Sequence, residues 1–195
     1  MIYDIYEEAL MYAIKKHKNQ FRKGKIIKPY IEHPIAVSKL VEEYMMGDIE
    51  KEKYKIAALL HDTLEDTDAT YDEEKKLFGD EIADIVLRLT NDKDKIKKYG
   101  KNIYLANKLL NMEDKTLTLK LCDRLDNVKD LLIGDNDFVK KYMQETTFIL
   151  NCLLLNRSLG QTHLKLINEI MLTETKVAGI SKLDMRPKKK ILKIE

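Results

Sequence analysis

Apolar side chains recur at spacings of three and four residues along most of the chain, which is the pattern of amphipathic helices. Three such stripes start at Ile5, Ile82 and Ile103, and two more run through residues 142–153 and 164–171. Only seven glycines and three prolines occur in 195 residues, so turn-forming positions are few. We therefore predict an all-α fold, a bundle of about eight to ten helices.

One segment, residues 115–121, fits two patterns. Leu117, Leu119 and Leu121 alternate as in a strand, but Leu117 and Leu121 also begin a series at helical spacing that extends to Leu132. No convincing second strand is available to pair with this segment. We therefore predict that it is helical.

Two segments, residues 19–33 and 91–101, carry polar and basic residues between predicted helices, and we expect both to be functional loops. Pro34 predicts a helix start just after the first loop, because a proline at the first helical position loses no hydrogen bond. We predict one domain over residues 1–175 and a basic tail over residues 176–195.

The composition argues against a membrane protein and against a disulfide-stabilised secreted protein. Charged residues make up 35% of the chain, and no apolar run approaches the roughly 18 residues of a membrane-spanning helix. The N-terminus lacks the basic-then-apolar layout of a signal peptide. Cys122 and Cys152 lie in apolar helical patterns. We therefore expect two buried, reduced thiols in a cytoplasmic protein.

The net charge of +2 is unevenly distributed along the chain. Residues 181–195 hold six Lys or Arg and two Asp or Glu, a balance of +4, so the other 180 residues carry −2. The body is therefore not a basic nucleic-acid binder. We expect the tail to be solvated rather than bound to an anion or a nucleic acid.

Ionisable residues gather where a buried helix is predicted to end. His61 and Asp62 directly follow the apolar run at residues 56–60, and Glu65 and Asp66 come four residues after them. If the helix continues by one turn, these four side chains stack on one face. Unpaired charge is costly in a protein core, and a divalent metal ion would compensate it.

Two further residues are candidate ligands for such a metal. His33 precedes a predicted helix start, and Asp123 lies in an otherwise apolar helix. Two histidines and two carboxylates form a mixed nitrogen and oxygen site, which suits Mn²⁺, with Zn²⁺, Fe²⁺ and Mg²⁺ as alternatives. Each residue alone has an ordinary explanation as a capping or ion-paired group, and only their joint occurrence favours a metal site. We expect His17 and His163 to be packing or surface residues.

Four short sequence motifs occur in a characteristic order along the chain. They read Gln-Phe-Arg-Lys at 20–23, Pro-Tyr-Ile-Glu-His-Pro at 29–34, His-Asp-Thr-Leu-Glu-Asp at 61–66 and Lys-Leu-Cys-Asp-Arg-Leu-Asp-Asn at 120–127. Together they resemble the hydrolase domain of the RelA/SpoT alarmone enzymes over about residues 5–155. Because no synthetase or regulatory region follows, we expect a stand-alone small alarmone hydrolase similar to the metazoan SpoT homolog.

The resemblance implies a helical HD-domain fold, a bound Mn²⁺ and hydrolysis of ppGpp or pppGpp to GDP or GTP plus pyrophosphate. By position, Glu65 and Asp66 would orient and deprotonate the attacking water. The implied metal ligands are His33, His61, Asp62 and Asp123.

The resemblance also implies contacts to a guanine nucleotide. Arg22 would face the guanine, Lys23 would help to hold the phosphates, and Asn127 would contact the nucleoside. Tyr142 is a weaker candidate for the wall of the nucleotide site. No membrane partner is implied, and a nucleic-acid partner is not expected.

The sequence departs from the family pattern at a few positions. The family usually reads Arg-Lys-Ser-Gly where Gly24 and Lys25 follow Arg-Lys here, and it often has Ala and His where Cys122 and Asp126 stand. The missing serine keeps one alternative open: a phosphohydrolase acting on another nucleotide, such as an NADPH 2′-phosphatase or a nucleotide phosphodiesterase. An alarmone-binding module without turnover is a separate alternative, against which the intact Glu65 and Asp66 argue.

Overall fold

The structure is a computed structural model that describes residues 4–22, 27–131 and 136–178. Within these residues the chain is all-α, as predicted, and an isolated bridge between Phe21 and Pro29 is its only β-type pairing. Nine helices have eight or more residues, and α4 and α7 are shorter. The helices are α1 Ile5–Lys16, α2 Glu32–Tyr44, α3 Lys51–Leu60, α4 Thr63–Asp66, α5 Tyr71–Phe78, α6 Asp80–Leu89, α7 Lys93–Tyr99, α8 Lys101–Leu110, α9 Asp114–Asp130, α10 Asn136–Asn156 and α11 Gln161–Ala178.

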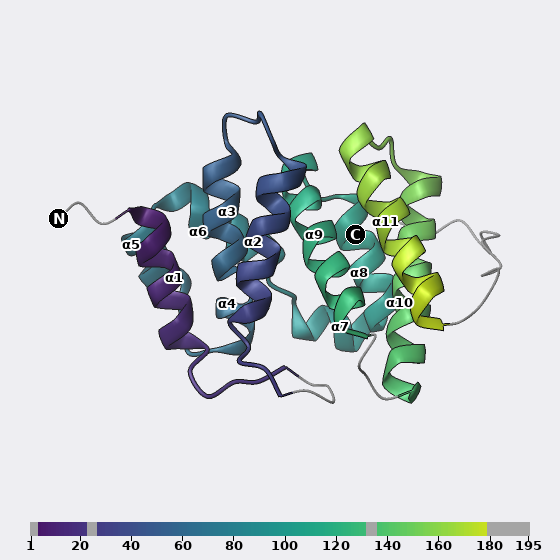
Figure 1. The fold of residues 1–195 in the computed structure, drawn as a ribbon, viewed down its shortest axis with the longest axis horizontal. Coiled ribbons are helices and arrows are strands. Elements are labelled where there is room, and N and C mark those ends of the chain that lie inside the picture. The colour runs from purple at the N-terminus through teal and green to yellow at the C-terminus, as the bar shows by residue number, and fades with distance from the viewer. Residues whose placement is uncertain (1–3, 23–26, 132–135, 179–195) are drawn as a thin grey trace.

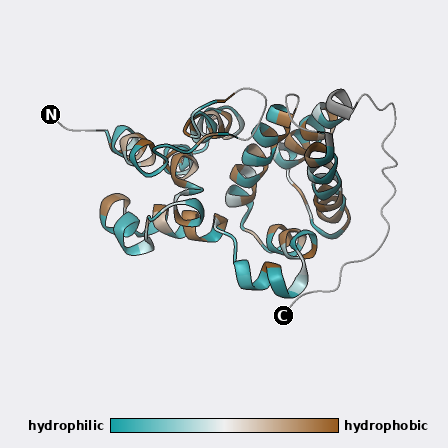
Figure 2. Cartoon of the chain, turned by 90° about the horizontal axis from the view of Figure 1, so that it is seen from below, coloured by the Kyte–Doolittle hydropathy of each residue, from teal (hydrophilic) through white to brown (hydrophobic). Residues whose placement is uncertain are grey.

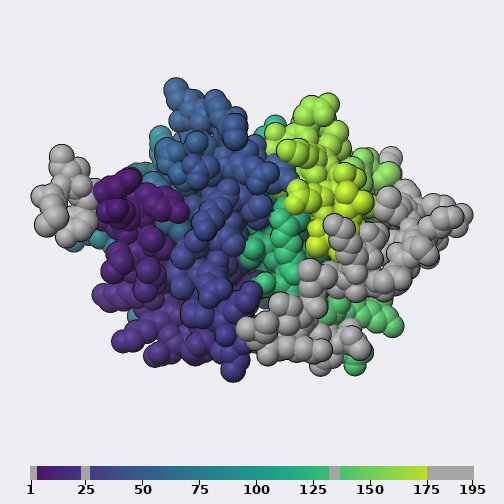
Figure 3. Space-filling model, in the orientation of Figure 1, coloured from purple at the N-terminus to yellow at the C-terminus, as the bar shows by residue number. Residues whose placement is uncertain are grey.

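Helix α9 is the central element of the fold. It packs against α2, α3, α6 and α11 (Figure 1), and in Figure 3 it is visible as a green strip between α2 and α11. Residues 116–125 of this helix are all buried. The helical prediction for residues 115–121 is therefore confirmed, and the alternating leucines have a simple explanation: a helix surrounded by other helices is apolar on more than one face.

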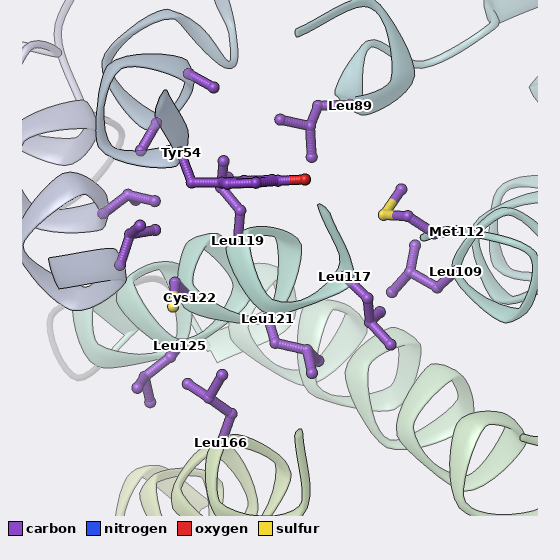
Figure 4. Close-up of a cluster of buried hydrophobic side chains, with 14 of the residues drawn as sticks. Tyr54, Leu89, Leu109, Met112, Leu117, Leu119, Leu121, Cys122, Leu125 and Leu166 are labelled. Carbon is purple, nitrogen blue, oxygen red and sulfur yellow. The ribbon is translucent and has the colours of Figure 1, made fainter. Parts of the chain in front are cut away.

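Figure 4 shows buried side chains of the hydrophobic core on several sides of α9. Leu117, Leu119 and Leu121 point to different sides of the helix, and Tyr54 of α3 and Leu166 of α11 approach from opposite directions. All three leucines are fully buried. Many helices in Figure 2 carry both hydrophobic and hydrophilic residues, as amphipathic helices do.

The prediction of a loop at residues 91–101 is wrong, because α7 occupies most of that segment. The Asp92 side chain caps this helix by accepting hydrogen bonds from the backbone N–H groups of Asp94 and Lys95, at 3.0 and 2.9 Å. Gly100 ends it with a positive φ of 81°, a conformation that glycine adopts without strain. The local capping residues therefore outweigh the polar composition.

The segment before α2 is a loop closed by backbone pairing, as predicted for the first loop. Arg22 N–H donates to Lys28 O and Tyr30 N–H donates to Gln20 O, each at 2.9 Å. Helix α2 begins two residues before Pro34, which corrects the predicted start. Proline is tolerated there because the first N–H groups of a helix have no partner within the helix.

Cys122 and Cys152 are both buried and free, as predicted. Among the described residues, no helix is long and apolar enough to cross a lipid bilayer. The predicted basic tail lies mostly outside the described residues, since only residues 176–178 belong to α11.

Candidate metal centre

Four ionisable side chains from three parts of the chain meet at one point in the interior. His33 comes from the first turn of α2, His61 and Asp62 from the junction between α3 and α4, and Asp123 from the middle of α9. Nε2 of His61 lies 3.0 Å from Asp62 Oδ2 and 3.7 Å from Asp123 Oδ1. Nε2 of His33 lies 3.8 and 3.2 Å from the same two oxygens. All four predicted metal ligands are thus brought together.

The orientation of both imidazole rings is set by their other nitrogens. His61 Nδ1 lies 2.8 Å from the backbone oxygen of Ala58, and His33 Nδ1 lies 2.6 Å from Asp126 Oδ2. Both partners are acceptors, so each Nδ1 carries a proton, and each Nε2 in its deprotonated form directs a lone pair to the meeting point. Histidines that bind metals are usually held in this way.

The electrostatic environment of this point favours a positive charge. Burial alone would lower the pKa of His61, but the carboxylates of Asp62 and Asp123 outweigh it and raise the pKa to about 10, so without a metal ion Nε2 holds a proton at the position that a divalent cation would take. His61 Nε2 is buried and has no hydrogen-bond partner among the described residues. Two lone pairs and two carboxylate oxygens around one point form a donor set that fits a divalent cation. His33, His61 and Asp62 also place their ligand atoms within 4.8 Å of one another.

Each of the two carboxylates is fixed by neighbours that the sequence analysis did not assign to the site. Tyr30 donates a 2.5 Å hydrogen bond from its hydroxyl to Asp62 Oδ2. Lys120 lies 2.8 Å from Asp123 Oδ2 and is itself buried. Burial would raise the pKa of Asp123, but Lys120 and the two imidazoles hold it well below its usual range. Tyr30 and Lys120 both lie inside motifs of the sequence, at 29–34 and 120–127, and the three-residue spacing on a helix was the signal that could link Lys120 to Asp123.

Glu65 and Asp66 continue from this point along the single turn of α4. The backbone hydrogen bond from Asp66 N–H to Asp62 O, at 2.9 Å, shows that the helical turn predicted after His61 forms. Glu65 is turned toward Asn91, whose backbone and side-chain amides both donate to its carboxylate. Asp66 keeps contact with solvent. Partial burial and the charges of Asp62 and Glu65 raise its pKa, which makes Asp66 a better proton acceptor than an ordinary aspartate.

Arg22 and Asn127, two of the predicted substrate-binding residues, contact each other. Arg22 Nη2 donates to Asn127 Oδ1 at 3.0 Å, and Arg22 also pairs with Asp130 at 2.8 Å. Asn127 in turn donates to Asp123 Oδ1 at 2.6 Å. The guanidinium is therefore connected to a metal-ligand candidate through one amide side chain.

The other two predicted substrate-binding residues, Lys23 and Tyr142, add less to the description of the site. Lys23 lies outside the described residues. Tyr142, on α10, is half-buried and stacks against the guanidinium of Arg124, with Cζ 4.8 Å from the ring centroid. Arg124 follows Asp123 in sequence, so Tyr142 contacts a side chain next to a metal-ligand candidate.

The two remaining histidines are packed, as predicted. His163 is buried, and its Nε2 lies 2.9 Å from the backbone oxygen of Asp114. His17 is also buried and lies against Tyr30, with ring centroids 4.7 Å apart. His17 therefore supports the tyrosine that holds Asp62, a position that its sequence context did not indicate.

Comparisons with known proteins agree with this geometry. Residues 9–158 match the HD-domain family. The chain is 37% identical over 127 residues to the guanosine-3′,5′-bis(diphosphate) 3′-pyrophosphohydrolase MESH1 of Drosophila melanogaster, covering 65% of this chain and 69% of that protein. It is 42% identical over 142 residues to the enzyme of the same activity name from Aquifex aeolicus, covering 72% of this chain but only 20% of that longer protein.

A solved structure has the same arrangement of helices. It is that of a metazoan ortholog of SpoT that hydrolyses ppGpp. It superposes with a TM-score of 0.72 at 28% identity, and the match covers 88% of this chain and 96% of that one.

Proposed function

The chain belongs to the HD-domain family, and we propose that it is a metal-dependent hydrolase that converts ppGpp or pppGpp to GDP or GTP and pyrophosphate. The observation that carries the proposal is the meeting of two Nε2 atoms and two carboxylate oxygens beside the acidic pair Glu65 and Asp66. Similarity to relatives named as 3′-pyrophosphohydrolases supports the substrate.

HD-domain hydrolases depend on divalent metals, and we propose that Mn²⁺ is the metal here. His33, His61, Asp62 and Asp123 would hold it, since two nitrogens and two oxygens suit Mn²⁺ and leave room for water and phosphate oxygens. When bound, a divalent cation offsets phosphate charge and lowers the pKa of coordinated water.

The acidic pair on α4 would move the proton of the attacking water. Asp66, whose pKa is raised and which remains open to solvent, would accept that proton while Glu65, held by Asn91, orients the water. The water oxygen bonds to the phosphorus attached to the 3′ oxygen, the bond between that phosphorus and the 3′ oxygen breaks, and the 3′ oxygen takes up a proton. Pyrophosphate and a free 3′ hydroxyl result.

Arg22, Lys23 and Asn127 would bind the guanine nucleotide, with Tyr142 nearby. The contact between Arg22 and Asn127 supports a shared role. A planar guanidinium stacks on a purine and also pairs with phosphate.

We propose that residues 1–175 act as one domain, because α11 packs directly on α9, which carries Asp123. We also propose a reducing, cytoplasmic location, because both cysteines are free thiols.

The test is separation by anion exchange of the products formed from ppGpp by the Mn²⁺-loaded protein. We expect GDP and pyrophosphate from the wild type, and no product after EDTA treatment or in Asp62→Ala. Asp68→Ala is the matched control, because Asp68 is 88% exposed and pairs only with Lys16 among the described residues. Metal content by mass spectrometry shows which cation the protein retains.

Other outcomes of this test would refute the proposed substrate or support a different function. Intact ppGpp with an occupied metal site would refute the proposed substrate. Phosphate release from NADPH in the same assay would then support a phosphohydrolase of another nucleotide. Tight binding of ppGpp without product would support a binding module.

A further inference from the structure

The two histidines at the metal centre are held by partners of different charge. His61 Nδ1 faces the neutral backbone oxygen of Ala58, whereas His33 Nδ1 faces the carboxylate of Asp126 at 2.6 Å. A hydrogen bond to an ionised acceptor is shorter and stronger than one to a neutral acceptor. His33 is therefore the more electron-rich of the two rings.

From this difference we infer that Asp126 is a positioning residue for the metal: it fixes the His33 ring and adds a negative charge directly behind it, and so sets the affinity of the centre for its cation. The inference rests on the proposed metal site. It concerns a residue to which neither the sequence pattern nor the similarity to relatives gave a role.

The surroundings of Asp126 keep its carboxylate directed at His33. The side chain of His33 is 1% exposed and that of Asp126 is 16% exposed, so solvent competes little for this hydrogen bond. Among the described residues, Arg22 is the Lys or Arg that pairs with Asp126, and its Nη2 lies 4.0 Å from Asp126 Oδ2 but only 2.8 Å from Asp130 Oδ2. Arg22 is thus paired mainly with Asp130, and Asp126 remains the partner of the imidazole.

Asp126 reaches His33 because of how α2 and α9 pack. The two residues are 93 positions apart, and the two helices are in direct contact. Asp123 and Asp126 lie three residues apart on α9, so they share a face of the helix. Asp123 thus approaches Nε2 of His33, and Asp126 approaches Nδ1 of the same ring.

The chain contains a matched control for this role. Asp130 lies one turn further along α9, carries the same charge and also contacts Arg22, but it makes no contact with His33 among the described residues. Asp126→Asn and Asp130→Asn therefore remove the same charge from neighbouring positions. Asp126→Ala removes both the charge and the hydrogen-bond acceptor, whereas asparagine can still accept from Nδ1.

The experiment is calorimetric titration of Mn²⁺ into the metal-stripped full chain, for the wild type and the three variants. We expect Asp126→Ala to weaken binding about ten- to a hundredfold, the usual effect of losing such a partner. Asp126→Asn should fall between this variant and the wild type, and Asp130→Asn should stay within about twofold of the wild type. Circular dichroism confirms that each variant is folded.

A second readout reports on the ring itself. In protein labelled with ¹⁵N-histidine, the nitrogen chemical shifts show which ring nitrogen of His33 carries the proton. We expect Nδ1–H in the wild type and in Asp130→Asn, and a mixture of tautomers in Asp126→Ala.

Equal metal affinities of Asp126→Ala and Asp130→Asn, with unchanged His33 shifts, would overturn the inference while leaving the metal site intact. Failure of the wild type to bind Mn²⁺ would instead remove the metal site, and the inference with it.

Discussion

Asn91 holds the carboxylate of Glu65 with two hydrogen bonds, one from its backbone N–H at 2.9 Å and one from its side-chain amide at 3.2 Å. Lys108 in turn donates to Asn91 Oδ1 at 3.2 Å and to the backbone oxygens of Leu89 and Thr90 at 2.7 Å. Glu65 on α4 is thus held by Asn91, in the segment that follows α6. Lys108 of α8 holds this segment in turn.

Asn91→Ala should slow catalysis without weakening substrate binding. The variant keeps the backbone hydrogen bond to Glu65 but loses the side-chain one, so the carboxylate orients the attacking water less well. Loss of one hydrogen bond to a charged group costs about 1.5 kcal/mol or more, so kcat should fall about tenfold with KM nearly unchanged. Steady-state kinetics with ppGpp measure both constants. A rise in KM at constant kcat would assign Asn91 to substrate binding instead.

Removing the metal should lower the stability of the folded protein. A cation that binds only the folded state stabilises it by about 2.7 kcal/mol when present at a hundred times its dissociation constant. Scanning calorimetry should therefore show a higher Tm with Mn²⁺ than with EDTA. Asp62→Ala should show no such increase, whereas Asp68→Ala should behave as the wild type. An equal increase in Asp62→Ala would place the metal elsewhere.

Arg124→Met should destabilise the fold strongly. Arg124 is buried and donates to Glu145 Oε1 at 2.8 Å and to Thr146 Oγ1 at 3.2 Å. Without it, Glu145 keeps only the exposed Lys101 as an ion-pair partner among the described residues. Breaking a buried pair from one side costs about 3–5 kcal/mol. Urea unfolding measures the loss.

The control for Arg124 is Arg88→Met, which breaks an exposed ion pair with Glu113. Exposed pairs contribute at most about 1 kcal/mol, so this variant should unfold at nearly the urea concentration of the wild type. Similar losses in both variants would show that the Arg124 network is not a main contributor to stability.

Glu74 should make stability depend on pH. Burial raises the pKa of this carboxyl to about 7, above its unfolded value near 4.5, although its hydrogen bond with Thr63 opposes the increase. Between these values the folded state binds more protons than the unfolded state, so the free energy of unfolding falls as pH rises from 4.5 through 7. The total fall from this group is about 3 kcal/mol.

Comparison with Glu74→Gln isolates this contribution, because other titrating groups are common to both proteins. Wild type and variant should differ little near pH 5, and the variant should be the more stable at pH 8. Urea unfolding at several pH values measures the difference. Parallel stability curves for the two proteins would contradict the raised pKa of Glu74.

Much of the candidate site could be predicted from sequence because its residues form a few short motifs, each with several polar side chains next to apolar helical segments. His61 and Asp62 are adjacent, and Asp66 follows within one helical turn. Asp123 stood out as a charged residue on an apolar helix. Asn91 gave no such signal, since a polar residue after a helix is ordinary, and only the tertiary structure brings it to Glu65, 26 positions earlier.

The helical class followed from the periodicity of apolar residues alone, since a spacing of three and four residues has few other solutions. The sequence also determined which residue types were available to a metal. Tertiary structure alone decided which nitrogen of each histidine faces the centre and that Asp126 lies behind His33. The physical reason is that these contacts depend on the angle and depth at which α2 packs on α9, and the whole buried core sets both.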